Sequence, residues 1–241
     1  MPTSGFPERS GSANTNAHEL FIIAPVPHSR SPRLWGTFSA SGGVGATTLT
    51  IHLARVASRL GKRVLVVESD SRAPLREILG AVPPFWEEYH RANALVKSES
   101  LPRNLRCGFA LLTRRSGAFI SEEIFTELCT VAGETFDLVL FDNPEHRPLN
   151  LNSMIIAENT LPSLIGINSL TPALKPKIVV INKSFTRVKK RSAIKGFITD
   201  APIYTLPRSQ DFNLALGFGV LRKLSQQNER RVDEIAREIL H

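Results

Sequence analysis

Two kinds of hydrophobic pattern alternate along the chain from Leu34 to the C-terminus. Short runs of consecutive apolar residues are typical of strands that are buried on both faces of a sheet. Between these runs, apolar residues recur every three or four positions, as they do on one side of an amphipathic helix. This alternation predicts an α/β fold with a mostly parallel sheet and helices on both faces. We expect strands at Leu34–Ser39, Arg63–Glu68, Phe109–Thr113, Asp137–Asp142, Met154–Ala157, Ile178–Asn182 and Ile203–Leu206.

Three segments carry the helical pattern. It is clearest in Thr47–Leu60, weaker in Glu122–Val131, and returns at the end of the chain in Asn228–His241. The last segment has two interpretations, a helix on a membrane surface or a closing helix that packs on the sheet. Its polar side carries acidic residues and it has no bulky aromatic anchor, which favours the closing helix.

The first 30 residues are rich in Ser, Pro, Asn and Thr and show little apolar periodicity. We predict a flexible N-terminal arm over residues 1–30 and one α/β domain over residues 31–241. No apolar run reaches the roughly 18–20 residues of a membrane-spanning helix, and the N-terminus lacks the apolar stretch of a secretory signal. We therefore expect a cytoplasmic protein.

Composition narrows the choice of partners. The chain has 30 Lys and Arg against 22 Asp and Glu, and its formal net charge of +8 favours an anionic partner. Nucleic acid, an acidic membrane surface and phosphorylated ligands all fit this description. The two cysteines, Cys107 and Cys129, lie outside any CxxC or Cys/His cluster. The sequence therefore indicates neither a disulfide framework nor a structural zinc site.

The most informative segment is ASGGVGATT, positions 40–48, between a predicted strand and a predicted helix. Three glycines in four positions let successive N–H groups point inward, and the following helix adds the positive end of its dipole. Thr47 and Thr48 then offer hydroxyl groups to a magnesium ion and a phosphate oxygen. The segment departs from the P-loop pattern at Ala40, in place of Gly, and at Ala46, in place of Lys. A glycine-rich turn that binds nothing is the alternative interpretation.

With the segments that follow it, this loop resembles the MinD/ParA family of deviant Walker A ATPases, whose loop usually reads KGGVGKTT. VLVVESDS at 64–71 is similar to the second strand with its Walker A′ acid, and FDLVLFDNP at 136–144 to the Walker B strand. IVVINK at 178–183 is similar to the strand whose Asn recognises the base. LPRSQD at 206–211, followed by Ala215 and Gly219, is similar to the segment that closes over the nucleotide. The resemblance implies a P-loop NTPase fold that binds ATP and Mg²⁺.

The resemblance also implies roles for single residues. Thr47 would be a magnesium ligand, and Asp142 would hold a magnesium-bound water. Asp70 would act in catalysis by orienting the attacking water, or would help to hold the metal. Asn182 would bind adenine, with Pro207 beside it. The phosphates would lie on Gly42, Gly43, Val44, Gly45, Ala46, Thr47 and Thr48.

Asp142, Asn182 and Asp70 also have structural interpretations, in which they bind no ligand. Asp142 could cap the turn after its strand, and Asn182 could satisfy a strand end. Asp70 could be the N-cap of a short helix that ends near Leu79, and Glu68 is a competing acid.

The two lysines of the family loop are replaced by Ser41 and Ala46. Phosphoryl transfer depends on positioning and charge stabilisation, so we expect ATP and ADP to bind while hydrolysis is weak or absent. Arg72, Arg114 and Arg115 are candidate substitute cations. The loop is similar to that of an atypical branch of the family, the TadZ/CpaE proteins that localise tight-adherence pili, and of the cellulose-synthesis BcsQ proteins.

The family implies a nucleotide-dependent homodimer that positions a cargo. For this chain the cargo would belong to a pilus, secretion or polysaccharide apparatus, or would be DNA. The segment Lys183–Lys195 carries six cations and no acid. It is either a solvated loop or a surface that binds DNA without sequence preference, or an anionic membrane. In the second case the protein would lie at the membrane or the nucleoid.

Two other classes of function stay open at this point. Gly43-x-Gly45-x-x-Thr48, with Glu68 about 20 residues further on, partly fits the fingerprint of an NAD(P)-binding Rossmann oxidoreductase. That class explains neither the Thr47–Thr48 pair nor the acid at Asp142. The other class is a scaffold that keeps the fold but binds no nucleotide.

Overall fold

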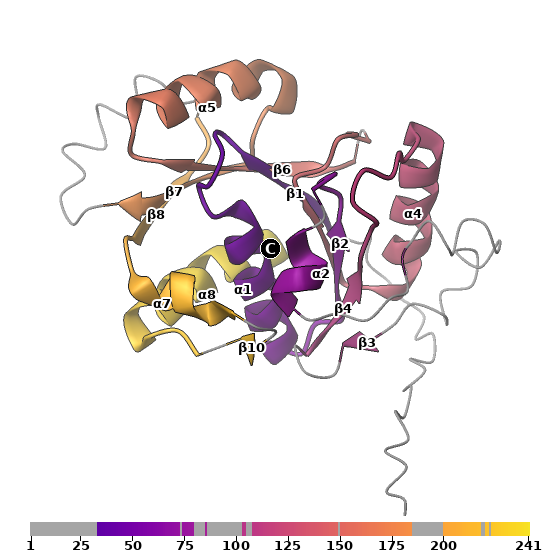
Figure 1. Ribbon diagram of the computed structural model, residues 1–241, viewed down its shortest axis with the longest axis horizontal. Coiled ribbons are helices and arrows are strands. Elements are labelled where there is room, and N and C mark those ends of the chain that lie inside the picture. Colours follow the sequence, from indigo (N-terminus) through magenta and orange to yellow (C-terminus); the bar gives the residue numbers. More distant parts are fainter. Residues whose placement is uncertain are drawn as a thin grey trace, which may run out of the picture.

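A computed structural model describes residues 33–72, 74–79, 85, 103–104, 108–148, 150–184, 200–217, 220–221 and 223–241. The predicted N-terminal arm, residues 1–30, and positions 185–195 of the basic segment lie outside the described residues. The predicted α/β fold is confirmed in the part of the chain that the structure describes (Figure 1).

The main sheet has the strand order β3-β4-β2-β5-β1-β6-β7-β8. Seven of these strands are parallel, and β3 pairs with β4 in the antiparallel sense. The seven parallel strands are the seven predicted from the sequence, each within two residues of its predicted ends. Their bounds are β1 Arg33–Ser39, β2 Val64–Glu68, β4 Phe109–Leu112, β5 Leu138–Asp142, β6 Asn152–Glu158, β7 Ile178–Ser184 and β8 Ile203–Pro207, with β3 at Arg103–Asn104.

Helices cover both faces of the sheet, as predicted (Figure 1). One face packs on α1 (Ala46–Arg59), α2 (Pro74–Leu79), α7 (Gln210–Ala215) and α8 (Gln226–Leu240). The other face packs on α4 (Glu122–Thr135) and α5 (Leu161–Leu174). Side chains alternate between the faces along each strand, so Val66 contacts the α1 side while its neighbour Val67 contacts the α4 side. A short antiparallel pair, β9 (Leu216–Gly217) and β10 (Val220–Leu221), follows α7.

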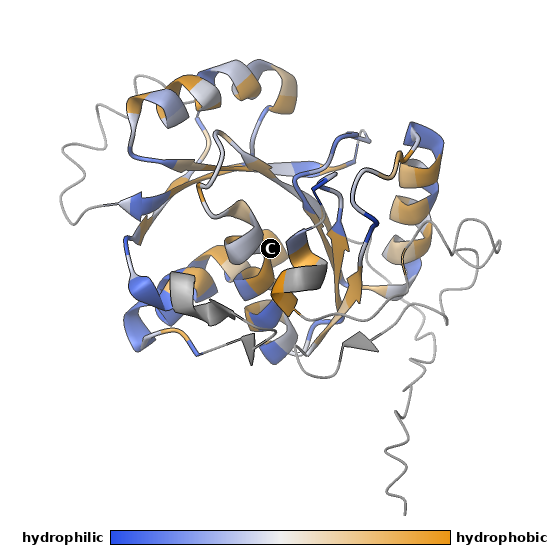
Figure 2. Ribbon diagram, viewed as in Figure 1, coloured by the Kyte–Doolittle hydropathy of each residue, from blue (hydrophilic) through white to orange (hydrophobic). Residues whose placement is uncertain are grey.

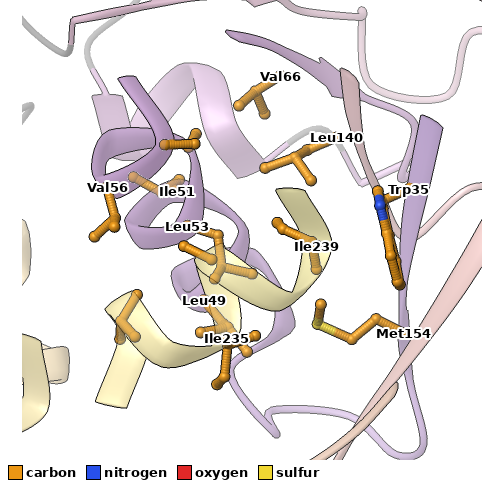
Figure 3. Packing of buried hydrophobic residues seen from close by; sticks show 14 of the residues in the cluster. Trp35, Leu49, Ile51, Leu53, Val56, Val66, Leu140, Met154, Ile235 and Ile239 are labelled. Atoms are coloured by element: carbon orange, nitrogen blue, oxygen red, sulfur yellow. The ribbon is translucent and has the colours of Figure 1, made fainter. Parts of the chain in front are cut away.

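The larger core lies between the sheet and the pair α1 and α8 (Figure 3). Trp35 and Met154 of the sheet meet Leu49 and Leu53 of α1 and Ile239 of α8 in this layer. Each fully buried aliphatic side chain contributes about 1.5–3 kcal/mol of transfer free energy. Apolar residues predominate in the strands of the sheet, and polar residues predominate at the loops and on the outer sides of several helices (Figure 2). The predicted closing helix is confirmed, because α8 packs directly on α1 and β8.

The helix α5 was not predicted. Its sequence, LPSLIGINSLTPAL, has no polar stripe, and it contains Gly166 and Pro172. Pro162 stands in the first turn, where a missing N–H costs nothing. The helix packs so closely on the loop after β1 that a Cβ on Gly166 would lie 2.0 Å from the Ala40 carbonyl oxygen. Tertiary contact therefore explains this helix better than periodicity does.

Candidate functional site

The glycine-rich loop joins β1 to α1 at the carboxyl edge of the sheet, where ligands of open α/β sheets bind. Gly43 and Gly45 have φ angles of 75° and 89°, in the left-handed region that favours glycine. Gly45 directly precedes α1 and offers no side chain to its first N–H groups, and the first turn carries no acid. This helix start is suited to an external anion. Gly42 and Gly43 are exposed, whereas Val44 and Ala46 are buried and anchor the loop in the core.

The structure brings the two predicted magnesium residues together. The Thr47 hydroxyl donates a hydrogen bond of 2.8 Å to Asp142 Oδ2. This contact follows from the strand order, because β5 pairs with β1 and places Asp142 beside Thr37 at the end of the strand. Asp142 is fully buried, and its Oδ1 has no hydrogen-bond partner among the described residues.

Asp142 lies in an acidic environment. Burial, together with the charges of Asp70 and Glu68, raises its pKa to about 7, against the hydrogen bond from Thr47 and the charge of Arg72. No group of three or more His, Cys, Asp or Glu side chains arranged to hold a metal occurs within the described ranges. Mg²⁺ bound with a nucleotide usually needs only one or two protein oxygens and takes its other ligands from water and phosphate. The unpartnered Asp142 oxygen and the adjacent Thr47 hydroxyl fit that requirement.

Asp70 is held by other side chains of this edge. The Arg72 guanidinium donates to both of its carboxylate oxygens, the Arg72 amide donates at 2.9 Å, and Asn143 Nδ2 donates at 3.3 Å. Burial acts to raise the pKa of Asp70, but the bonds and charge of Arg72 hold it below its usual value. Asn143, which was not among the predicted site residues, has a φ of 49°, and its side chain lies between Asp70 and the Ser39 amide.

The proposed capping role of Asp70 is not what the structure shows. Glu68, which is fully buried, accepts hydrogen bonds from the Leu75 amide at the start of α2 and from the Arg114 amide just after the end of β4. The competing acid is therefore the one that supports the short helix. These bonds also leave Glu68 tied to the chain, away from the ribose contact that a Rossmann fingerprint would require.

Asn182 supports the loop from the end of β7. Its Nδ2 donates 2.7 Å to the Val44 carbonyl, and its Oδ1 accepts 2.8 Å from the Lys183 amide. A Cβ on Gly45 would lie 2.6 Å from Asn182 Nδ2, so this contact requires glycine. Asn182 therefore hydrogen-bonds a backbone group at the end of its strand, as its structural interpretation predicted. The same side chain and Pro207 line a pocket of about 180 Å³, together with Gly43, Gly45, Thr48, Lys183, Arg208, Ser209 and Phe212.

Of the three predicted substitute cations, Arg72 is paired with Asp70, and its charge also acts on Asp142. Arg114 is buried and donates to the carbonyls of Ser69 and Ala118. Arg115 lies over the Phe85 ring, 4.7 Å from its centroid. The cation that the structure places on the loop is Lys183, whose Nζ donates to the Gly43 carbonyl. The sequence shows that Lys183 directly follows Asn182, but it does not show that the Lys183 side chain points toward the loop.

The helix α5 contacts the other side of the loop. Ser41, at the position of a family lysine, shares a hydrogen bond of 2.6 Å with Ser163 of α5. Two large apolar side chains of the same helix, Leu161 and Ile165, are exposed. The helix that contacts the loop therefore also exposes apolar side chains.

Strand order distinguishes between the classes of nucleotide-binding fold. In the dinucleotide-binding arrangement the first strand lies beside the second, whereas here β5 with its terminal acid lies between β1 and β2. A loop between β1 and α1, facing an acid on the adjacent strand, defines an α/β fold of the P-loop NTPase type. The chain belongs to the CobQ/CobB/MinD/ParA nucleotide binding domain family, whose model matches residues 36–221.

Solved structures share this fold at low sequence identity. MinD of Pyrococcus horikoshii OT3, complexed with Mg-ADP, is 18% identical, covers 86% of this chain and 96% of its own, and has a TM-score of 0.69. A ParA family ATPase from Chlorobium tepidum TLS is 20% identical over 85% of this chain and 98% of its own, with a TM-score of 0.69. MinD in the Aquifex aeolicus MinC:MinD complex is 18% identical over 86% and 96%, with a TM-score of 0.72. No curated protein sequence matches the chain significantly.

No helix in the described ranges has both the length and the apolar character needed to cross a membrane.

Proposed function

We propose that this protein binds ATP and ADP with Mg²⁺ on the loop after β1, and that the bound nucleotide controls a homodimer which positions a cargo. The observation that carries the proposal is the Thr47–Asp142 hydrogen bond of 2.8 Å, beside the uncapped start of α1. A hydroxyl and a buried carboxylate stand together where backbone N–H groups can bind phosphate. Mg-ADP in the Pyrococcus MinD structure is consistent with this ligand.

Each predicted site residue has a part in this proposal. The phosphates lie on the N–H groups of residues 42–48, and Thr47 and Asp142 hold Mg²⁺, with Asp142 acting through a bound water. When bound, the ion neutralises charge on the phosphate oxygens. Asn182 and Pro207 line the side of the pocket that receives the base. Asp70, fixed by Arg72 and Asn143, orients the attacking water.

Hydrolysis is weak or absent in this proposal. Ser41 and Ala46 replace the two loop lysines, and Ser41 is bonded to Ser163. Arg72 is paired with Asp70, and Arg114 is engaged by backbone carbonyls. Charge stabilisation of the transferred phosphoryl group is therefore limited, whereas backbone N–H groups still support binding in the ground state.

The dimer forms through the face that carries the loop. The exposed Leu161 and Ile165 of α5 support this assignment, since Ser163 and Gly166 of the same helix contact the loop directly. A change of the loop on nucleotide binding would therefore be transmitted to an apolar surface. The cargo belongs to a pilus, secretion or polysaccharide apparatus, as the likeness of the loop to TadZ/CpaE and BcsQ suggests. The MinC:MinD complex is a precedent for a protein partner in a related fold.

The basic segment Lys183–Lys195 gives the protein an additional contact with non-specific DNA or an anionic membrane. The protein would then be cytoplasmic, with a fraction at the membrane or the nucleoid. Binding through this segment would weaken steeply as salt increases.

A titration with fluorescent ATP in the presence of Mg²⁺ tests the nucleotide site, with unlabelled ATP, ADP and NADH as competitors. Gly43→Val should abolish binding, because it blocks the approach of the backbone to the phosphates. Gly61→Val is the matched control, since Gly61 has a similar φ of 78° and open space around it, but lies outside the loop. Absence of ATP binding to the folded wild-type protein would favour a scaffold without a nucleotide. Preferential NADH binding would favour a dinucleotide-binding protein.

Light scattering with size-exclusion chromatography tests the switch. MgATP should double the mass of the wild-type protein and leave Gly43→Val monomeric. An unchanged mass with intact ATP binding would contradict nucleotide-controlled dimerisation.

A further inference from the structure

The loop that faces the proposed phosphates contains no cation. Positions 40–48 read ASGGVGATT, with Ser41 and Ala46 at the two places where the family loop has lysine. Backbone N–H groups and a helix dipole supply partial charges only. Apart from the proposed Mg²⁺, a full positive charge at this site has to come from another part of the chain.

Lys183 brings such a charge to the loop from the end of β7. Its Nζ donates to the Gly43 carbonyl and lies 2.6 Å from Glu158 Oε1. Its side chain is 36% exposed, so the ammonium group lies at the solvent boundary of the pocket. Lys183 lines the pocket with Gly43, Gly45 and Thr48, the residues on which phosphates are proposed to lie.

The backbone is arranged to direct this side chain. Lys183 has a φ of 51°, a left-handed conformation that is uncommon for a residue other than glycine. The pairing of β7 with β8 shifts in register between Ile181 and Ser184, and Asn182 Oδ1 accepts from the Lys183 amide. Strained backbone of this kind persists where the surrounding contacts fix it, and it is frequent at functional sites. The first cation of the basic segment is thereby turned toward the loop.

We infer that Lys183 supplies the phosphate-binding cation that the loop lacks. The ammonium group has three N–H donors, and the contacts with Gly43 and Glu158 use two of them. A phosphate oxygen on the loop takes the third donor while Gly43 keeps its bond. Glu158 holds the ammonium in place as a positioning residue. The inference rests on the proposed nucleotide site and adds to it the source of its positive charge.

Two substitutions distinguish the positive charge of Lys183 from its hydrogen bond to the loop. Lys183→Gln keeps a donor for the Gly43 carbonyl but removes the charge, and Lys183→Arg keeps the charge. Lys177→Gln is the control, because Lys177 is an exposed lysine just before β7, at the opposite end of the same strand. Thermal unfolding establishes that each variant is folded.

The measurement is the affinity of each full-length variant for ATP, ADP and adenosine in Mg²⁺. Because a charge-assisted hydrogen bond is lost, Lys183→Gln should lower the affinity for ATP and ADP by about tenfold or more. The affinity for adenosine should not change. Lys183→Arg should stay close to wild type, and Lys177→Gln should match it.

Wild-type affinity for ATP in folded Lys183→Gln would overturn the inference and leave the proposed function standing. An equal loss for adenosine would also overturn it, since the residue would then shape the pocket rather than bind phosphate. Failure of the wild-type protein to bind ATP would instead contradict the proposed function itself.

Discussion

The helices α1 and α4 begin in opposite ways. Both have 14 residues and lie on opposite faces of the same sheet. At the start of α4, the Ser121 hydroxyl accepts a hydrogen bond from the Ile124 amide, and Glu122 and Glu123 stand in the first turn. At the start of α1 there is neither a side-chain cap nor an acid. The protein therefore satisfies one helix start with its own groups and leaves the other uncapped, as the proposed phosphate site requires.

The side chains around the start of α1 also differ from those at a helix start that serves structure alone. Thr47, in the first turn of α1, donates to the buried Asp142, whose second oxygen has no partner among the described residues. The α1 start thus carries polar groups whose bonding is incomplete, and a structural helix end does not need them. A buried polar atom without a partner is costly to folding, and the proposed Mg²⁺ and nucleotide would give this one its missing contact.

The largest expected effect concerns the acid that faces α1. The folded-state pKa of Asp142, about 7, is above its unfolded value, so the folded protein holds a proton that the unfolded chain releases between about pH 4 and 7. The stability contributed by this proton is therefore fully present below about pH 4 and is lost as the pH rises to about 7. Asp142→Asn should raise the free energy of unfolding at pH 8 by up to about 4 kcal/mol.

Urea denaturation of the wild-type protein and Asp142→Asn from pH 4 to 8 measures this difference. His52, whose pKa burial lowers to about 4, makes stability rise with pH over an overlapping range. That contribution is common to both proteins and cancels in the comparison. Parallel stability curves would show that Asp142 does not hold the proton. Mg²⁺ with ATP should stabilise only the wild-type protein at pH 8.

The next effect concerns the glycine that precedes α1. Gly45→Ala places a methyl group 2.6 Å from Asn182 Nδ2 at a φ of 89°. It should weaken ATP binding about 100-fold, because the loop must shift away from the geometry that presents its N–H groups. Gly61→Ala has a comparable φ of 78° and open space, so it should keep wild-type affinity despite a similar backbone cost. Equal affinities for the two variants, measured by calorimetry, would contradict the role of the loop.

A smaller effect is expected when α1 is given the acid that α4 already has. Thr48 is half-buried in the first turn of α1 and lines the pocket. Thr48→Asp should lower the affinity for ATP about tenfold, because the carboxylate repels the phosphates. The free energy of unfolding should stay unchanged or rise by about 0.3–1 kcal/mol, because the acid interacts favourably with the helix dipole. Thr48→Asn is the neutral control of nearly the same shape. If the Asp and Asn variants bind ATP equally in a competition titration, charge at this helix start is irrelevant to the ligand.

The smallest effect belongs to α4. Ser121→Ala removes the hydroxyl that accepts from Ile124 and should lower the free energy of unfolding by about 1 kcal/mol. ATP affinity should not change, because this helix start lies on the other face of the sheet and is filled by its own groups. Thermal unfolding and the ATP titration check the two halves of this statement. A loss of ATP affinity would show that the two helix starts are not independent.

The structure shows the surroundings of the two residues that replace the family lysines, Ser41 and Ala46. Ser41 replaces one of them and bonds to Ser163, in a helix that no periodicity predicts. Ala46 replaces the other and is buried in the core. Lys183, which the sequence places in a run of surface cations, lies instead on Gly43. The site can therefore regain a charge from a position that no pattern within the loop reveals.

Local patterns in the sequence determined most of the fold. The apolar runs located the seven parallel strands, and the helical repeat located α1, α4 and α8, because burial on a sheet or helix face leaves a periodic trace in adjacent residues. The glycines before Thr47 and the acid at Asp142 also indicated their site, since each stands at the end of an apolar strand. The sequence of α5 left no such trace, because its apolar residues surround the whole helix.

Tertiary structure decided which side chains meet. Thr47 and Asp142 are 95 positions apart, and Gly43 and Lys183 are 140 apart, so their contacts depend on strand order and on the left-handed turn at Lys183. The same holds for Glu68, whose bonds to Leu75 and Arg114 fix it as a support of α2. Periodicity is a property of neighbours along the chain, whereas a hydrogen bond between distant segments exists only after the sheet has been assembled. The sequence alone thus determined where the glycine-rich loop lies, and only the tertiary structure decided which charges face it.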